Sequence, residues 1–342
     1  MRPSFFHHLH PPTIPAAQAQ WRYTFGAGGI AVMLVLVLLV TGALEMFFYI
    51  PTPDQAGPSI QTIAFLVPFG GVVRNLHYWA AQALIVAVVV HLLRVVFTGA
   101  YVPPRRFNYL LGLALLVLSL LLDFTGYALR WDEGVRWALV AGTNLLRTVP
   151  WMGGGLYALA VGGPEPGGAT LIRFYAWHVF GLILPLVILS VWHLFRVRRD
   201  GGIAVPPPTA RASAKRISRN ELVRREALAA LVAGVALLAL ALWRAAPLAP
   251  PITIGSEVIA ETRAPWFFLW VQQLLRWGDP FWAGVFVPLA LTVGLALIPY
   301  LLPAPPRSQL GRWFPPGGRL AQIIVGAIAL LMIGLTMLAL YP

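Results

Sequence analysis

Residues 71–94 read G-V-V-R-N-L-H-Y-W-A-A-Q-A-L-I-V-A-V-V-V-H-L-L-R, an apolar run with a histidine near each end. As an α-helix, this run is long enough to cross a bilayer. His77 and His91 are fourteen residues apart, close to four helical turns, so both rings point the same way about 21 Å apart along the axis. An imidazole in hydrocarbon is costly unless it faces protein and has a partner. The stretch therefore predicts a membrane helix that presents two histidines to neighbouring protein at two depths.

The composition of the whole chain is that of a membrane protein. Of 342 residues, 58% are hydrophobic and 11% are charged, whereas a soluble domain has about a quarter charged residues. The net charge of +13 comes almost entirely from arginines. They lie between apolar spans, which favours loops at a cytoplasmic membrane surface over nucleic-acid binding. Cysteine is absent, which excludes disulfides, cysteine-ligated iron–sulfur clusters and thioether-linked haem within this chain.

Seven apolar segments are long enough, or nearly so, to cross a bilayer and predict an all-α polytopic membrane protein. They are residues 26–49, 77–99, 108–130, 173–196, 226–244, 281–302 and 320–340. Arginines crowd the second, fourth and sixth connections, which seven crossings place on one side. The positive-inside rule makes that side cytoplasmic, together with the N-terminus. The sequence thus predicts a multi-pass protein of the cytoplasmic (inner) membrane, with longer Gly-, Pro- and Trp-rich loops outside.

A polar segment with three consecutive prolines divides the chain. Residues 206–220 are predicted to be a cytoplasmic linker. It separates a four-span domain, residues 1–205, from a three-span C-terminal domain, residues 221–342, and the first of these contains a four-helix bundle.

The fourth span carries a second pair of histidines. His178 and His193 are fifteen residues apart, so on a straight helix the second ring is rotated by about 60°. Pro185 lies between them and is expected to kink or loosen the helix, which would absorb the mismatch. The second and fourth spans run parallel, so His77 can face His178 near the outer surface and His91 can face His193 near the inner one.

Two facing pairs of imidazoles supply the axial nitrogens of two six-coordinate haems. Zinc or di-iron sites are the alternative, but they need carboxylates or more ligands at each level. Neither span contains Asp or Glu. The sequence therefore predicts two non-covalent, bis-histidine b-type haems, with iron bound by His77, His178, His91 and His193.

Arginines and glycines recur beside these histidines. The arginines placed at the membrane edges to pair with haem propionates are Arg74, Arg94, Arg173 and Arg196. Snorkelling of interfacial arginines explains any one of them equally well. Glycines repeat at the fourteen-residue interval in the first and third spans, where they would let flat macrocycles lie against the backbone: Gly28, Gly42, Gly112 and Gly126. Helix packing through small residues is the alternative there.

The motifs around these residues resemble the cytochrome b family of cytochrome bc and b/f complexes. They are G-V-V-R-N-L-H-Y-W (71–79), H-L-L-R-V-V-F-T-G-A-Y (91–101), T-G-Y-A-L-R-W-D-E (125–133) and T-L-I-R-F-Y-A-W-H (170–178). The fifteen-residue interval and the seven spans resemble the chloroplast type fused to its three-span companion subunit. This resemblance implies a homodimer, a Rieske iron–sulfur protein, and a c-type cytochrome or equivalent acceptor subunit.

The resemblance also implies a mechanism. Quinol is oxidised at an outer site, where one electron passes to the Rieske protein. The other electron crosses the membrane to a quinone at an inner site, and the cycle is coupled to proton translocation. The outer pocket would involve Trp131, Trp137, Ala138 and the loop between the fifth and sixth spans. The expected catalytic residues are Tyr127, Asp132, Glu261 and Trp266.

One motif departs from the family. The stretch A-P-W-F-F-L (264–269) has Pro265 where the family's P-E-W-Y has a proton-accepting glutamate, and Phe267 where it has tyrosine. It is similar to the A-P-W-Y-F-L of menaquinol-oxidising bacterial relatives. Glu261, Asp132, Glu133 or a histidine of the Rieske protein could accept the proton, although interfacial carboxylates are mostly just solvated.

Two other functions stay open on the sequence. The chain could be a di-haem electron conduit or anchor subunit of another quinone-linked complex, without a working outer site. It could also be a non-redox transporter, which would bind no haem. For the inner quinone pocket, the candidates are Arg196, Asp200 and His10.

The lack of cysteine predicts the number and attachment of the haems. Chloroplast-type relatives bind a third haem through a cysteine whose aligned position is Gly26 here. We expect two haems per chain, both extracted by acidified acetone because neither is covalently linked. Haem quantification per purified chain measures this, and a ratio of three would contradict it.

Overall fold

The computed structural model describes residues 12–20, 25–206, 215–252 and 263–341. Within them, seven helical segments are long and apolar enough to cross a membrane, which confirms the predicted all-α, seven-span architecture. The spanning helices are α3 (Ala27–Glu45), α5 (Gly70–Phe97), α6 (Arg106–Ala128), α9 to α10 (Gly168–Arg199), α11 (Arg219–Trp243), η4 with α13 (Trp282–Leu301), and η6 with α14 (Pro316–Leu340). The second span begins seven residues earlier than predicted, so His77 lies inside the helix rather than at its start.

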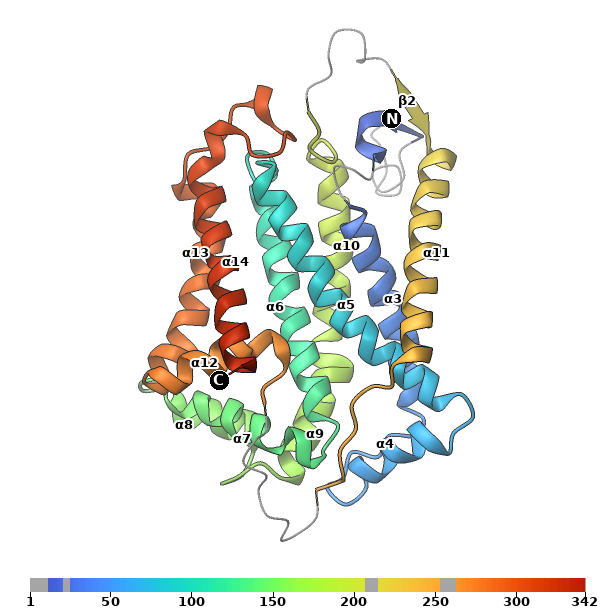
Figure 1. Cartoon of the computed structure of the whole chain (residues 1–342), viewed down its shortest axis with the longest axis vertical. Coiled ribbons are helices and arrows are strands. Elements are labelled where there is room, and N and C mark those ends of the chain that lie inside the picture. Colours follow the sequence, from blue (N-terminus) through green and yellow to red (C-terminus); the bar gives the residue numbers. More distant parts are fainter. Residues whose placement is uncertain (1–11, 21–24, 207–214, 253–262, 342) are drawn as a thin grey trace.

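Four of these helices form the central bundle. α5 packs against α3 and α6, and α6 packs against α10. The last three spans do not stand apart as a unit. α11 packs on α3 and α5, whereas α13 packs on α6 and α14 on α5, so they flank the bundle on opposite sides (Figure 1). Large apolar side chains, such as Leu231 and Leu330, are exposed along these outer helices and suit contact with lipid.

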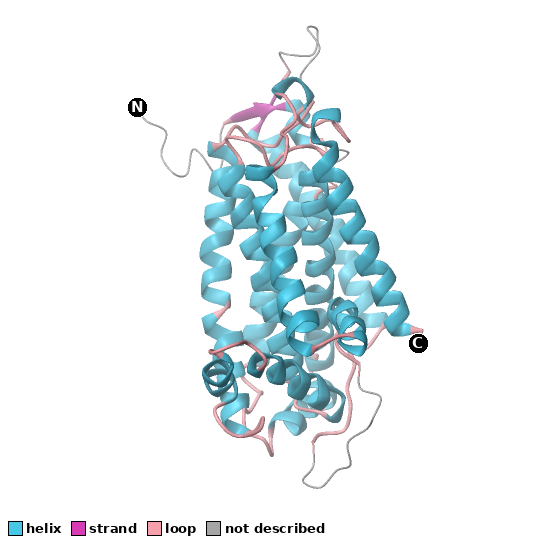
Figure 2. Cartoon of the chain, turned by 90° about the vertical axis from the view of Figure 1, so that its left-hand side faces the viewer, coloured by secondary structure: helices cyan, strands magenta, loops and turns pink. Residues whose placement is uncertain are grey.

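The two ends of the molecule differ (Figures 1 and 2). One end, here called the short-helix end, carries α4 (Ala56–Phe65), α7 (Glu133–Arg147), α8 (Gly153–Val161) and α12 (Leu269–Trp277) with η3 (Trp266–Phe268). The other, here called the strand end, carries an antiparallel pair, β1 (Thr13–Pro15) and β2 (Arg216–Ser218), with η1 (Ala16–Ala19) and η5 (Arg307–Gln309). The arginine-rich connections lie at the strand end.

Polar side chains of α5 hold the segment that follows α11. Arg74 donates to the carbonyls of Ala246 and Pro247, at 3.1 and 2.6 Å. Asn75 donates to the carbonyl of Ala241 at 2.9 Å and accepts from the backbone of Ala246 at 2.9 Å. These bonds satisfy backbone groups in the last turn of α11 and just past it, where no intrahelical partner exists. They fix the start of the connection to α12 against the bundle.

The fourth span contains a π-helical turn, η2 (Trp177–Gly181), directly before α10 (Ile183–Arg199). Leu182 N–H bonds to the carbonyl of Trp177, five residues back, at 2.8 Å. A π turn adds one residue to an α-helix. His178 and His193, fifteen residues apart, therefore point the same way as two residues fourteen apart on a regular α-helix. We expected the extra residue of the fifteen-residue interval to be absorbed at a kink around Pro185. The structure instead absorbs it in the preceding π turn, which contains His178. Pro185 has no N–H to offer the carbonyl of Gly181, which favours an irregular turn there.

The strand end is predicted to face the cytoplasm and the short-helix end the outside. Because the chain contains no cysteine, single introduced cysteines can test this orientation. Glu165, between α8 and α9, and Ser308, in η5, are both exposed at opposite ends. We expect Glu165→Cys to react with a membrane-impermeant maleimide in intact cells, and Ser308→Cys to react only after permeabilisation. The reverse pattern would place the strand end outside the cell.

Candidate functional site

The four histidines of the bundle meet as two pairs. The ring centroids of His77 and His178 are 6.3 Å apart at an interplanar angle of 66°. Those of His91 and His193 are also 6.3 Å apart, at 77°. Two metal–nitrogen bonds of about 2 Å each, together with the ring radii, require a centroid separation of about 6 Å. Each pair therefore fits one metal ion held between two axial imidazoles.

The surroundings of the pairs fit haem iron better than zinc or a di-iron centre. Across the described ranges, no group of three or more His, Cys, Asp or Glu side chains could hold a metal ion. A two-nitrogen site suits an iron whose other four ligands come from a macrocycle. Zinc needs at least three protein ligands, and di-iron sites need carboxylates.

Hydrogen bonds to Nδ1 fix the tautomer of three of the rings. Asn108 offers His193 a backbone carbonyl at 3.1 Å, which can only accept. The Thr41 hydroxyl donates to the carbonyl of Val37 at 2.7 Å and lies 2.9 Å from Nδ1 of His77, so it accepts from that ring. Thr125 does the same for His178 at 3.1 Å, while donating to α6 carbonyls. A protonated Nδ1 leaves Nε2 as the metal-binding nitrogen.

Each of the four repeated glycines faces one histidine ring. An added Cβ would lie 3.0 Å from Cε1 of His77 at Gly42 and 3.4 Å from that of His91 at Gly28. At Gly112 it would lie 3.4 Å from Cε1 of His193, and at Gly126 only 2.7 Å from that of His178. The imidazole rings lie next to these glycines, and the expectation that the glycines make room for macrocycles stays a prediction. α3 and α6 thus back the rings that α5 and the fourth span present.

The four arginines expected at the propionates have protein partners. Arg74 and Arg94 are buried and donate to backbone carbonyls, Arg94 to that of Ala204 at 2.7 Å. Arg173 is half-buried, donates to the carbonyl of Ala169 and packs on Gly162. Arg196 forms an ion pair with Asp200 at 2.9 Å. Arg74 is three residues from His77, and Arg94 is three from His91, so these two lie about one helical turn beyond each ring.

At the short-helix end, the structure places three of the four expected catalytic residues. Asp132 is 1% exposed and accepts from Arg130 at 2.6 Å and from the backbone of Ala249 at 3.1 Å. Its role there is to join the corner before α7 to the segment after α11. Tyr127 donates to the carbonyl of Gly134 at 2.9 Å. Trp266 is 44% exposed, and Glu261 lies outside the described residues.

The sequence interpretation missed two polar residues of this region. Gln82, on α5, accepts from Nε1 of Trp266 at 2.6 Å and donates to both carboxyl oxygens of Asp123, on α6, at 3.1 and 3.3 Å. The signal was present, because an ionisable residue inside an apolar span is by itself a candidate functional group. Asp123 is the only acidic residue of the predicted span 108–130.

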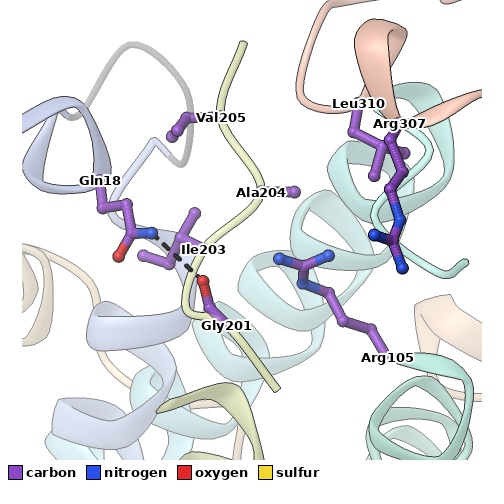
Figure 3. Close-up of a pocket in the computed structure, with 8 residues that line it drawn as sticks. All are labelled: Gln18, Arg105, Gly201, Ile203, Ala204, Val205, Arg307 and Leu310. Carbon is purple, nitrogen blue, oxygen red and sulfur yellow. Dashed lines mark hydrogen bonds between the residues drawn. The ribbon is translucent and has the colours of Figure 1, made fainter. Parts of the chain in front are cut away.

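A cavity of about 290 Å³ lies at the strand end (Figure 3). Its lining includes Gly201, which directly follows Asp200, the ion-pair partner of Arg196. Arg105 and Arg307 enter it from different elements, and Arg105 also donates to the carbonyl of Gly202 at 3.2 Å. Burial lowers the pKa of Arg105, and the carboxylate of Asp200 opposes that shift. His10, the third residue expected near an inner quinone, lies outside the described residues.

Comparison with known proteins identifies the family. Residues 82–255 match the family model described as cytochrome b (N-terminal)/b6/petB. The chain belongs to this cytochrome b family. The cytochrome b6 of Heliomicrobium gestii is 40% identical over 177 residues, which cover 52% of this chain and 83% of that protein. The menaquinol:cytochrome c reductase cytochrome b subunit of Geobacillus thermodenitrificans is 34% identical over 195 residues, covering 57% and 87% respectively.

The fold has a counterpart among solved structures. A chain of a hyperthermophilic respiratory Complex III matches with a TM-score of 0.78 and 20% sequence identity, over 93% of this chain and 84% of that one. At this identity the match shows the fold alone. It extends beyond residue 255, so the last three spans of this cytochrome b share the architecture as well. The protein is therefore a multi-pass membrane cytochrome b of the bc and b/f type.

The glycine distances predict a graded response to alanine substitution. Gly126→Ala places a methyl group 2.7 Å from His178, so the ring must shift, at a cost of about 1–3 kcal/mol. We expect loss or a clear potential shift of the outer b haem with the inner one retained, as seen by redox titration. Gly28→Ala, at 3.4 Å, should have a smaller effect on the inner haem.

Gly294→Ala on α13 is the matched control, because nothing lies within 4 Å of its added Cβ. It should leave both haems unchanged. Equal titrations for Gly126→Ala and Gly294→Ala would show that the close approach to His178 does not matter.

Proposed function

We propose that this chain is the di-haem cytochrome b subunit of a quinol-oxidising cytochrome bc-type complex, a quinol–cytochrome c or similar-acceptor oxidoreductase. The observation that carries the proposal is the pair of facing imidazoles at each of two levels, 6.3 Å between centroids in both cases. On α5 the levels are separated by fourteen residues, or about 21 Å along the helix axis. Two redox centres at this separation link the two membrane surfaces.

The residues of the bundle fit b-type haem. His77 with His178, and His91 with His193, would each hold one haem iron, which would accept and release one electron at a time. The Nδ1 partners hold the rings in the binding tautomer. The apolar helices around them exclude water, and Arg74 and Arg94 supply positive charge one turn beyond each pair.

The relatives support the proposed partners, and the distribution of arginines supports the proposed orientation. A cytochrome b subunit 34% identical to this chain belongs to a menaquinol:cytochrome c reductase. We assign to this chain the corresponding partners, a Rieske iron–sulfur protein, a c-type cytochrome or equivalent acceptor, a membrane quinone and a second copy of itself. The arginine-rich strand end would face the cytoplasm, with the N-terminus, and electron transfer would be coupled to proton translocation.

The chain combines a four-span di-haem part, residues 1–205, with a three-span part, residues 221–342, through a linker at 206–220. The packing of α11 on one side of the bundle and of α13 and α14 on the other supports a single unit assembled around the histidines. It also brings η3, with Trp266, to the α5–α6 contact through the bond from Trp266 to Gln82.

A second function is favoured by one specific observation. Pro265 and Phe267 lack the carboxyl and the hydroxyl of the family motif, and Phe267 is buried among aromatic rings. A chain without a proton acceptor at the outer site would serve as a di-haem conduit between a partner and the quinone pool.

Oxidant-induced reduction separates the two functions. The purified complex is given menaquinol, its inner site is blocked, and a pulse of ferric oxidant is added while the b-haem absorbance is followed. We expect the oxidant to cause reduction of the b haems, because removing one quinol electron sends the other into the bundle. Oxidation of the b haems, with no transient reduction, would favour the conduit.

A further inference from the structure

Asp123 is a carboxyl group inside a membrane-spanning helix. It lies on α6, three residues before Gly126, whose added Cβ would touch His178. Its backbone is thus about 4.5 Å along the axis from the glycine that backs the outer pair. A carboxyl group at this depth is expensive and marks a functional site by default.

Nothing in the described ranges neutralises Asp123 by a direct ion pair. The ion pairs found there involve Asp132, Glu133, Asp200, Glu226 and Glu221. Among the residues that the structure describes, the side-chain hydrogen-bond partner of Asp123 is the amide of Gln82, which donates to Oδ1 and Oδ2. A carboxylate offers about four lone-pair sites, so Asp123 keeps free acceptor capacity. A purely structural carboxyl group would have an arginine or several donors.

The hydrogen-bond chain connects Asp123 to the altered family motif. Trp266, next to Pro265, donates from Nε1 to Oε1 of Gln82 at 2.6 Å. Indole Nε1 is only a donor, so it fixes the amide with its oxygen toward Trp266 and its nitrogen toward Asp123. Phe124, the neighbour of Asp123, contacts Phe268 of the same motif at 6.0 Å between ring centroids. Gln82 therefore links a carboxyl group on α6 to the motif that lacks one at position 265.

We propose that Asp123 is the acceptor of a quinol proton at the outer site and that Gln82 positions it. This inference rests on the proposed function. Oxidation of one quinol releases two protons and two electrons. One hydroxyl O–H bond breaks, and its proton goes to a carboxylate oxygen of Asp123, which becomes a neutral carboxylic acid. The other proton goes to a histidine of the iron–sulfur partner. One electron would pass to that partner's cluster, and the other to the haem that His77 and His178 would hold.

The other carboxyl groups are less suitable. Asp132 is 1% exposed and is held by Arg130 through two hydrogen bonds to Oδ2, at 2.9 and 2.6 Å. Glu133 is engaged with Arg136 at the start of α7. Asp123, by contrast, is partly exposed, and Gln82 connects its carboxyl group to Trp266 of the motif.

The test uses the intact purified complex with Asp123→Asn, Asp123→Glu and a control, Asp54→Asn. Asp54 is an exposed carboxyl group at the same end of the molecule, hydrogen-bonded to its near neighbours Thr52 and Gln55. We expect Asp123→Asn to slow quinol oxidation and oxidant-induced haem reduction about 100-fold. The Asp123→Glu variant should recover most of the rate, and both variants should keep wild-type haem spectra and potentials.

A second readout follows the proton directly. Infrared difference spectra on quinol addition should show the C=O band of a protonated carboxyl group in the wild type and in Asp54→Asn, and should lack it in Asp123→Asn.

The outcomes separate the inference from the function beneath it. A wild-type rate in Asp123→Asn, or an unchanged infrared band, overturns the inference while the proposed function stands. Loss of haem in Asp123→Asn, or an Asp123→Glu variant as slow as Asp123→Asn, means that the carboxyl group is structural, and this also overturns it. Absence of oxidant-induced reduction in the wild type overturns the proposed function and the inference together.

Discussion

The structure depends on two pairs of imidazoles, in which a histidine of α5 faces a histidine of the fourth span. Four polar rings stand in a region without water, and each must use both of its nitrogens there. For three of them, Nδ1 is satisfied by Thr41, Thr125 or the backbone of Asn108, and Nε2 is left for a metal. This requirement explains the other features of the bundle. α5 and the fourth span run parallel, a glycine backs each ring, and the fourth span takes up one extra residue in a π turn.

Much of this arrangement could be predicted from the sequence, because hydrophobic length and histidine spacing are local properties. The seven spans and the parallel course of the second and fourth follow from them, and the structure confirms those spans. The position at which the fourth span takes up its extra residue could not be predicted from these local properties. A proline attracts attention as a helix breaker, whereas a π turn around His178 has no composition of its own.

The side-chain partners were less predictable still. A threonine in a helix ordinarily bonds to its own backbone, and Thr41 and Thr125 do so. Their second role, accepting from a histidine on another helix, depends on tertiary packing. The same holds for Asp132, which the family resemblance marks for quinol chemistry and the structure places in a buried ion pair. Gln82 and Trp266 are 184 residues apart in sequence, and only the fold brings them into contact.

The two histidine pairs have the most direct bearing on function, since every electron path proposed for this cytochrome b passes through them. Their rings are steeply inclined, at 66° and 77°. Low-temperature electron paramagnetic resonance of the oxidised protein reports both the spin state and the relative orientation of axial imidazoles. We expect two distinct low-spin ferric signals of large g-anisotropy. A high-spin signal, a single low-spin species or a rhombic signal from parallel imidazoles would contradict it.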